Sequence, residues 1–317
     1  MSVYIAHRLF AAHDRALAAD LADRLAGKIG ADRVFLPFCD TDEEDLVAEV
    51  KGRRLFELDR DRLGRLDAMV AILHGPSLDD GVCMEIGYAA ASDVPVIVVS
   101  TDFQTYSVTE TGAHLEFPDP LIQAVATRIV RVAKLGPPTL SPTPVQSRFR
   151  GFRARNAVQT DTALDAAVDT LLDLPERPSL RTGPPPGIST HVYVEASPYT
   201  AWGRDHLAEA CVDAGHTVAV PQRFTATDPV AGALADLSAV RSAARLLADV
   251  SGPETPPGTA LLIGAALASG VQIAAFQPRV TFTHAQGREP NWRNLMVQYA
   301  TDAHLDSGEA VPPWLTV

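Results

Sequence analysis

The residues best suited to chemistry lie in one short segment, in which three carboxylates surround a glycine. Asp79, Asp80 and Gly81 are followed by Glu85 and Gly87, in the order Asp-Asp-Gly-x-x-x-Glu-x-Gly. A carboxylate in the first turns of a helix is stabilised as an anion, which is the state that a nucleophile needs. The segment therefore predicts a catalytic site in which Glu85 can attack an electrophilic carbon.

The same glycine frame recurs 177 residues later without its carboxylates (258 − 81 and 264 − 87). The corresponding pairs are Gly81 and Gly258, Gly87 and Gly264, Asp79 and Pro256, and Glu85 and Leu262. Each half also opens with a strand-like segment that carries a tyrosine, Tyr4 or Tyr193. A repeat of this length indicates a duplicated domain, because its unit is far longer than a solenoid repeat. We expect the second copy to be inactive.

Apolar strands that alternate with helical segments predict the fold class. Strands are predicted near residues 2–6, 33–37, 67–73 and 95–100, and in the second half near 191–195, 217–220, 244–249 and 271–276. Helices are predicted over 11–27, 43–64, 82–92, 118–134 and 159–174. This alternation is typical of a parallel sheet covered by helices on both faces. We therefore predict an α/β protein with two tandem doubly wound, flavodoxin- or Rossmann-like domains.

Proline-rich segments suggest where the two domains end. Residues 136–144 and 183–187 contain successive prolines, which remove backbone donors and restrict the residues before them. The predicted domains are residues 1–140 and 189–317, and residues 141–188 form a linker with one helix.

The edge of the predicted sheet explains how the carboxylates come together. In open parallel sheets, ligands bind outside the carboxyl ends of the strands. Asp79, Asp80 and Glu85 all follow the strand predicted at 67–73, so they lie at that edge. Asp80 is the predicted N-cap of the next helix, and Gly81 allows a close backbone approach.

Composition excludes several kinds of partner. The 317-residue chain has a net charge of −12, which argues against a nucleic acid polymer, because such binding needs clustered Lys and Arg. No apolar run is long enough to span a membrane and no signal peptide is evident, so a cytoplasmic protein is expected. The three scattered cysteines suggest neither a disulfide framework nor a zinc site. No ligand spacing implies a cofactor or a metal.

The first half resembles the nucleoside 2-deoxyribosyltransferases and the related N-glycoside hydrolases. The matching residues are Tyr4, Phe10, Asp61 and the box at 79–87. In that family the glutamate attacks the anomeric carbon, the tyrosine orients the glutamate, and aspartates bind the base and help to protonate it. The resemblance implies catalytic roles for Glu85, Tyr4, Asp61 and Asp79, with Asp59 as a close competitor of Asp61. It implies that Phe10 and Gly81 line the substrate site.

The family also takes an Asn-x-Met pair from a neighbouring subunit to close the sugar end of the pocket. This chain carries Asn294 and Met296 in its second half. The resemblance therefore implies a homodimer fused into one chain, whose second half completes the pocket of the first. An asparagine at this position suits a free 5′-hydroxyl better than a phosphate.

The resemblance predicts cleavage of the N-glycosidic bond of 2′-deoxynucleosides and transfer of the sugar to another nucleobase. The partners would be a small nucleoside and a nucleobase, without nucleic acid or membrane, and further homo-oligomerisation is left open. Two alternatives are a nucleoside or nucleotide hydrolase on the same residues and a non-catalytic module that binds or senses nucleotides.

Other reactive side chains fit these roles less well. Cys83 lies at the helix start but has no histidine in its motif to act as a base, so we expect a packed residue. His7 and His13 have no spacing typical of a metal pair, and His74 at a strand end is interpreted as a loop residue.

Overall fold

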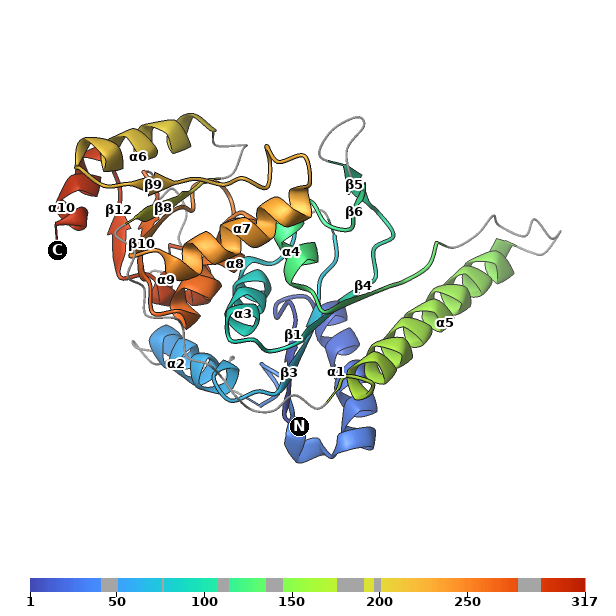
Figure 1. The fold of residues 1–317 in the computed structure, drawn as a ribbon. Coiled ribbons are helices and arrows are strands. Elements are labelled where there is room, and N and C mark those ends of the chain that lie inside the picture. The colour runs from blue at the N-terminus through green and yellow to red at the C-terminus, as the bar shows by residue number, and fades with distance from the viewer. Residues whose placement is uncertain are drawn as a thin grey trace.

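The structure of the protein is a computed structural model that describes residues 1–40, 51–75, 77–107, 114–134, 145–175, 191–196, 201–278 and 292–316. It contains two five-stranded sheets in which all strands are parallel (Figure 1). Both predicted proline-rich segments, and the start of the helix predicted over 43–64, lie outside the described residues.

The first sheet has the strand order β2-β1-β3-β4-β7. Its strands are β1 (Val3–Ala6), β2 (Val34–Phe35), β3 (Ala68–Ile72), β4 (Val96–Ser100) and β7 (Arg128–Arg131). The helices of this half are α1 (Ala12–Ile29), α2 (Lys51–Leu63), α3 (Asp80–Ala91), α4 (Pro120–Val125) and α5 (Val145–Leu172). A short antiparallel pair, β5 (Tyr106–Ser107) and β6 (His114–Leu115), extends beyond β4, and a 3-10 turn spans Ala31–Arg33.

The second sheet has the order β12-β11-β10-β8-β9, which is the same topology read from the other edge. Its strands are β8 (Val192–Glu195), β9 (Val218–Ala219), β10 (Arg245–Asp249), β11 (Gln272–Phe276) and β12 (Ala303–Leu305). Its helices are α6 (Ala201–Asp213), α7 (Pro229–Ser242), α8 (Pro257–Ala268), α9 (Leu295–Ala300) and α10 (Val311–Leu315), and a 3-10 turn spans Gly308–Ala310. In each half the second strand lies outside the first, as in flavodoxin-like sheets. The predicted fold class is confirmed.

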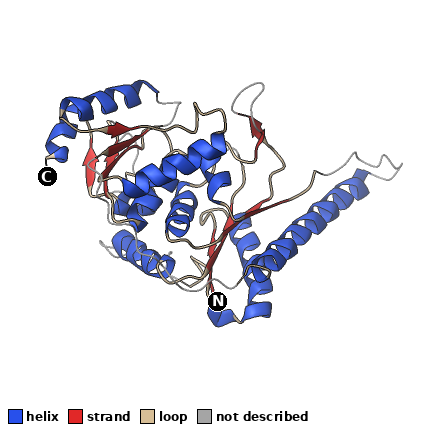
Figure 2. Ribbon diagram, in the orientation of Figure 1, coloured by secondary structure: helices blue, strands red, loops and turns tan. Residues whose placement is uncertain are grey.

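The helices form three layers around the two sheets (Figure 2). Helices α1 and α5 cover the outer face of the first sheet, and α6 and α10 cover the outer face of the second. Helices α2, α3, α4, α7, α8 and α9 lie between the sheets and share one continuous hydrophobic core. The central strands are buried on both faces, so they have continuous apolar runs such as Val96–Val99. The two halves therefore form one packed unit.

Two predicted helices have different limits in the structure. The helix predicted over 118–134 is wrong, because α4 ends at Val125 and β7 then pairs with β4. Asp119 caps α4 and Pro120 starts it, whereas the β-branched pair in Arg128–Arg131 favours a strand. The helix predicted over 159–174 starts at Val145. Its Leu164, Val168 and neighbouring residues pack on the first sheet, so this segment of the predicted linker is part of the outer helical layer.

Helices α3 and α8 cross at two glycines, so their backbones touch. A Cβ on Gly87 would lie 1.8 Å from the carbonyl oxygen of Leu261, and a Cβ on Gly264 would lie 1.9 Å from that of Met84. The two contacts are equivalent, because Gly264 and Leu261 are the counterparts of Gly87 and Met84, 177 residues later. Such a self-complementary contact is typical of a twofold dimer interface. The retained glycines therefore serve the packing of one half on the other.

A second contact joins equivalent positions across the same pseudo-twofold axis. The hydroxyl of Ser77 donates a 2.7 Å hydrogen bond to Oε2 of Glu254, which is its counterpart 177 residues later. The chain thus has the arrangement of a fused dimer. No helix among the described residues has the length and apolar character that crossing a membrane requires.

Candidate functional site

Glu85 and Tyr4 form the centre of the candidate site. Tyr4 lies in β1 with 1% of its surface exposed, and Glu85 lies one turn into α3 with 7% exposed. The hydroxyl of Tyr4 donates a 2.6 Å hydrogen bond to Oε1 of Glu85. The Tyr4 ring is held by packing against Phe35 in β2, with the ring centroids 5.2 Å apart. The strand therefore fixes the orientation of a buried carboxylate on the helix.

Asp79, not Asp80 as predicted, is the N-cap of α3. Its Oδ1 accepts a 3.0 Å hydrogen bond from the backbone N–H of Val82, which is the usual capping contact. Burial raises the pKa of the Asp79 carboxyl, and the Val82 N–H and the nearby Arg8 partly oppose this rise. Glu254 adds to the rise through its negative charge. A raised pKa is what a proton donor needs.

Asp80 occupies the first turn of α3 and points toward the second half. Its Oδ2 accepts a 3.4 Å hydrogen bond from the backbone N–H of Thr255. Burial and then the neighbouring Asp79 raise the pKa of Asp80 to about 6. Two carboxylic acids with raised pKa values therefore flank the start of the helix that carries Glu85.

Asn294 reaches this helix start from the second half. A Cβ on Gly81 would lie 2.8 Å from Nδ2 of Asn294 and 3.1 Å from Oδ1 of Asp79. Asn294 is the N-cap of α9, and its Oδ1 accepts a 3.0 Å hydrogen bond from the N–H of Met296. Glycine is required at position 81 because any side chain would collide with Asn294. The structure thus brings Asn294, Gly81 and Asp79 together.

Two further contacts fix the Asn294 segment. The guanidinium of Arg293 donates hydrogen bonds to the carbonyl oxygens of Val250 (2.9 Å) and Gly252 (2.7 Å), just after β10. Met296 is buried in the core between the sheets and does not line an open surface. The segment is therefore anchored by the second sheet while its asparagine faces the first.

The predicted Asp61 lies apart from this group. Its side chain is 64% exposed and forms a 2.8 Å ion pair with Arg65 on the outer face of α2. Asp59, the alternative, is 6% exposed and shares the buried face of α2 with Phe56 and Leu63. Its counterpart 177 residues later is Asp236, which is also buried. The geometry favours Asp59, and its recurrence at the repeat distance is the sequence signal that distinguishes it.

Phe10, which the resemblance places in the substrate site, is an exposed residue after β1. Its side chain is 69% exposed, and its carbonyl accepts a hydrogen bond from Arg15. Cys83, by contrast, is fully buried, and burial raises the pKa of its thiol well above the usual range. A thiol in that state is not a nucleophile at neutral pH, in agreement with its predicted packing role.

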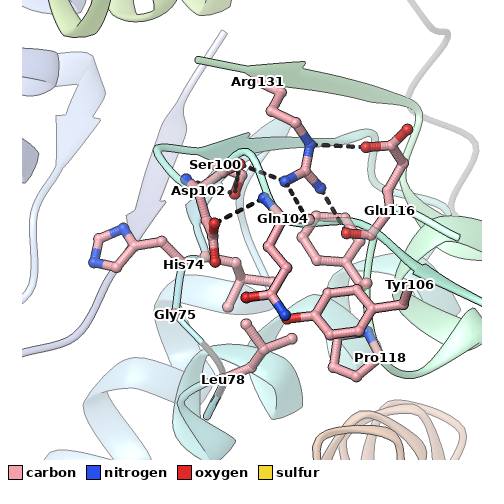
Figure 3. A pocket seen from close by; sticks show the side chains of 12 residues that line it. His74, Gly75, Leu78, Ser100, Asp102, Gln104, Tyr106, Glu116, Pro118 and Arg131 are labelled. Carbon is pink, nitrogen blue, oxygen red and sulfur yellow. Dashed lines mark hydrogen bonds and ion pairs between the residues drawn. The ribbon is translucent and has the colours of Figure 1, made fainter. Parts of the chain in front are cut away.

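A small pocket opens beside the candidate site, at the carboxyl ends of β3, β4 and β7 (Figure 3). Arg131 holds together the residues at the edge of the pocket. Its guanidinium donates hydrogen bonds to Oε2 of Glu116 (2.7 Å) and to the carbonyl oxygen of Gln104 (3.1 Å). The pocket has room for roughly one water molecule. Leu78 and Gly75 line the pocket. Tyr4 and Glu85 are not among the described residues that line it. The pocket is therefore separate from the Tyr4–Glu85 pair.

One group of described residues has the donor atoms for a metal ion. Ligand atoms of His13, Asp14 and His74 lie within 4.8 Å of one another, although no metal site was predicted for His13. Nε2 of His74 is 2.8 Å from Oδ1 of Asp14, and its ring points away from the small pocket (Figure 3). This hydrogen bond accounts for the contact without an ion. His74 lies in the loop after β3, as expected, and is there a partner of the buried Asp14.

Fold and site together define a class of protein. It has two flavodoxin-like sheets related by a pseudo-twofold axis, and the second half adds an asparagine beside the buried carboxylate of the first. The sequence model described as Nucleoside 2-deoxyribosyltransferase matches residues 3–135. Over residues 3–135 the chain therefore belongs to the nucleoside 2-deoxyribosyltransferase family.

Solved structures show weaker similarity. A conserved protein from Enterococcus faecalis V583 is 29% identical over 32% of this chain, with a TM-score of 0.30, and the match spans 65% of that protein's length. A 2-desoxiribosyltransferase from Leishmania mexicana is 21% identical over 39% of this chain and 95% of its own, with a TM-score of 0.33. Both TM-scores are below 0.5, so the family assignment rests on the sequence match. A search of curated proteins finds no match.

Proposed function

We propose that the protein cleaves the N-glycosidic bond of 2′-deoxynucleosides through a covalent ester on Glu85 and passes the sugar to another nucleobase. The observation that carries this proposal is the 2.6 Å hydrogen bond from Tyr4 to the buried Glu85. It holds one carboxylate in a single orientation at the carboxyl edge of the sheet, where ligands of such folds bind.

The reaction would proceed in two displacements. An oxygen of Glu85 attacks the anomeric carbon, a C–O bond forms, and the C–N bond to the base breaks. The departing base takes a proton from the Asp79 carboxyl, directly or through water, for which the raised pKa of Asp79 is suitable. A ring nitrogen of the second base then attacks the same carbon, the Glu85 carboxylate is released, and the Asp79 carboxylate takes up the proton that the second base loses. Two inversions give net retention at the anomeric carbon.

The charges around Asn294 favour a substrate without a phosphate. Asp79 and Asn294 both lie close to Gly81, and Asp80 is in the same first turn of α3. The guanidinium of Arg293 is directed at the carbonyl oxygens of Val250 and Gly252. A phosphate at this end would meet carboxylates, whereas a 5′-hydroxyl can hydrogen-bond with the Asn294 amide. We therefore propose nucleosides in preference to nucleotides.

An assay with two bases tests the proposal. The protein is incubated with a 2′-deoxynucleoside and a different free base, and the products are separated by chromatography. A new deoxynucleoside supports transfer, whereas free sugar and released base without a new nucleoside identify a hydrolase. Saturable binding without any product identifies a binding module. The parallel reaction with the 5′-monophosphate should be much slower.

Two variants make the assay specific. Glu85→Gln should remove all product, and Glu57→Gln, an exposed glutamate on α2, should retain the activity of the parent. Equal activity of the parent and Glu85→Gln would overturn the proposed mechanism.

A further inference from the structure

Arg223 lies in the second half at the place that corresponds to the candidate site of the first. It follows β9 and is only 1% exposed. Nε lies 3.0 Å from Oδ1 of Asp119, Nη2 lies 2.6 Å from Oε1 of Glu195, and Nη1 lies 3.1 Å from Oδ2 of Asp236. Asp119 belongs to the first half, whereas Glu195 and Asp236 belong to the second. The guanidinium therefore joins three carboxylates across the interface.

The partners of Arg223 are counterparts of residues around Glu85. Asp236 corresponds to Asp59 at the repeat distance of 177. Asp119 corresponds to Asn294, because each is the N-cap of a six-residue helix and accepts from the N–H two residues later. Arg223 thus contacts the counterpart of Asn294, which faces the start of α3 in the first half, and the counterpart of Asp59.

The glycine frame places the guanidinium at the start of α8. A Cβ on Gly258 would lie 1.9 Å from Oδ2 of Asp119 and 2.8 Å from Nη2 of Arg223. In the first half the equivalent Gly81 faces Asn294 in the same way. The side chain of Arg223 therefore lies where the second pocket would open.

We infer that the second pocket is a guanidinium-binding site whose ligand is the side chain of Arg223, which closes this pocket and ties the two halves together. The inference does not depend on the reaction proposed for Glu85, because it rests on the contacts of Arg223 and none of these involves Glu85. It accounts for the single candidate site in a chain with two related halves.

The positive charge of Arg223 compensates the buried carboxylates around it. Burial raises the pKa of Glu195, and Arg223 opposes this rise. Burial alone would lower the pKa of Arg223, but Asp119 and Glu195 raise it well above its usual range. Thr259 Oγ1 also donates a 3.1 Å hydrogen bond to Oε1 of Glu195, and the backbone N–H of Gln222 donates one of 2.8 Å to Oδ1 of Asp236. Without the guanidinium, three carboxylates would share a buried site with no cation.

Removal and chemical replacement of the guanidinium test this inference. Arg223→Ala should lower the melting temperature by roughly 6–20 °C, because one partner of a buried ionic cluster is lost. Methylguanidinium at about 20 mM should restore several degrees, since a ligand that binds only the folded state stabilises it. Tetramethylammonium at equal ionic strength should not, because it has no N–H donors.

Controls separate this effect from a general one. Arg245→Ala removes a second-half arginine whose Nε contacts Gln272 and which pairs with no carboxylate among the described residues, so methylguanidinium should not rescue it. An unchanged melting temperature in Arg223→Ala, or equal responses of all variants to methylguanidinium, would overturn the inference.

A neutralised variant decides the outcome if Arg223→Ala does not fold. Arg223→Met combined with Glu195→Gln, Asp236→Asn and Asp119→Asn removes the cation and the three carboxylates together. Such replacements are often neutral or stabilising, so this variant should melt near the parent and ignore methylguanidinium. If it too fails to fold, charge pairing by Arg223 is not what the site requires and the inference is wrong.

Discussion

Tyr4 donates its hydroxyl hydrogen to Glu85 over 2.6 Å, although the two residues are 81 positions apart in the chain. The bond links the first strand to the helix that follows the third strand. Tyr193 occupies the corresponding position in β8, where Leu262 replaces the glutamate. Tyr4 therefore meets a carboxylate at position 85, whereas the equivalent position in the second half is apolar.

Tyr4→Phe should reduce turnover by roughly 10- to 100-fold, because a hydrogen bond to a charged group contributes about 1.5–3 kcal/mol. KM should change little, since Tyr4 acts on Glu85 and not on the substrate. Tyr193→Phe is the matched control and should leave turnover unchanged. Steady-state kinetics on the three proteins provides the measurement, and equal losses in both variants would argue against an orienting role.

The two aspartates of α2 should differ sharply. Asp59→Asn should lower kcat/KM by at least about 30-fold, because the buried carboxylate that we propose to bind the base would lose its charge. Asp61→Asn should stay within about twofold, because an exposed i,i+4 ion pair contributes little. The reverse order would restore Asp61 as the functional residue.

The crossing of α3 and α8 makes a prediction about stability. Gly87→Ala should lower the free energy of unfolding by more than about 3 kcal/mol, because the new Cβ would meet the carbonyl of Leu261 at 1.8 Å. Gly151→Ala lies in α5 with open space around it and should stabilise by about 0.5–1 kcal/mol. Urea titration of both variants measures the difference. A mild effect of Gly87→Ala would mean that the helices can separate at this point.

Asp80 should make stability depend on pH. Its pKa is raised to about 6 in the folded protein, so its contribution to stability is fully present below about pH 3.8 and is lost as the pH rises through 6. Asp80→Asn should therefore be more stable than the parent at pH 7.5, by roughly 1–3 kcal/mol. The advantage should grow between about pH 4 and pH 6 and then level off. Denaturant titrations at several pH values test this, and an advantage that is independent of pH would contradict it.

The sequence predicted the elements whose signals are local. Continuous apolar runs identified the central strands, and the glycine frame identified the repeat and the helix that carries Glu85. The error at 118–134 arose because a short apolar run such as Ile129–Val130 fits a helix as well as a strand. The N-cap differed from the prediction by one residue, since Asp79 and Asp80 are both good caps.

Contacts between distant segments were beyond local patterns. Choosing between Asp59 and Asp61 requires knowing which face of α2 packs against the core. The leucines of α2 do not show this, because they do not all lie on one face of the helix. The Arg223 cluster joins residues 119, 195, 223 and 236 from four separate segments, and no single segment shows a binding motif. The pairing of Asn294 with the start of α3 was predicted only through the family resemblance.

Mass spectrometry of the intact protein tests the central claim most directly. The protein is mixed with a 2′-deoxynucleoside in the absence of an acceptor base and quenched with acid during the first turnover. A mass increase of one deoxyribosyl group, located on Glu85 by peptide mapping and absent in Glu85→Gln, is the predicted result. Release of base by the parent without any such adduct, or an adduct that persists in Glu85→Gln, would contradict the account.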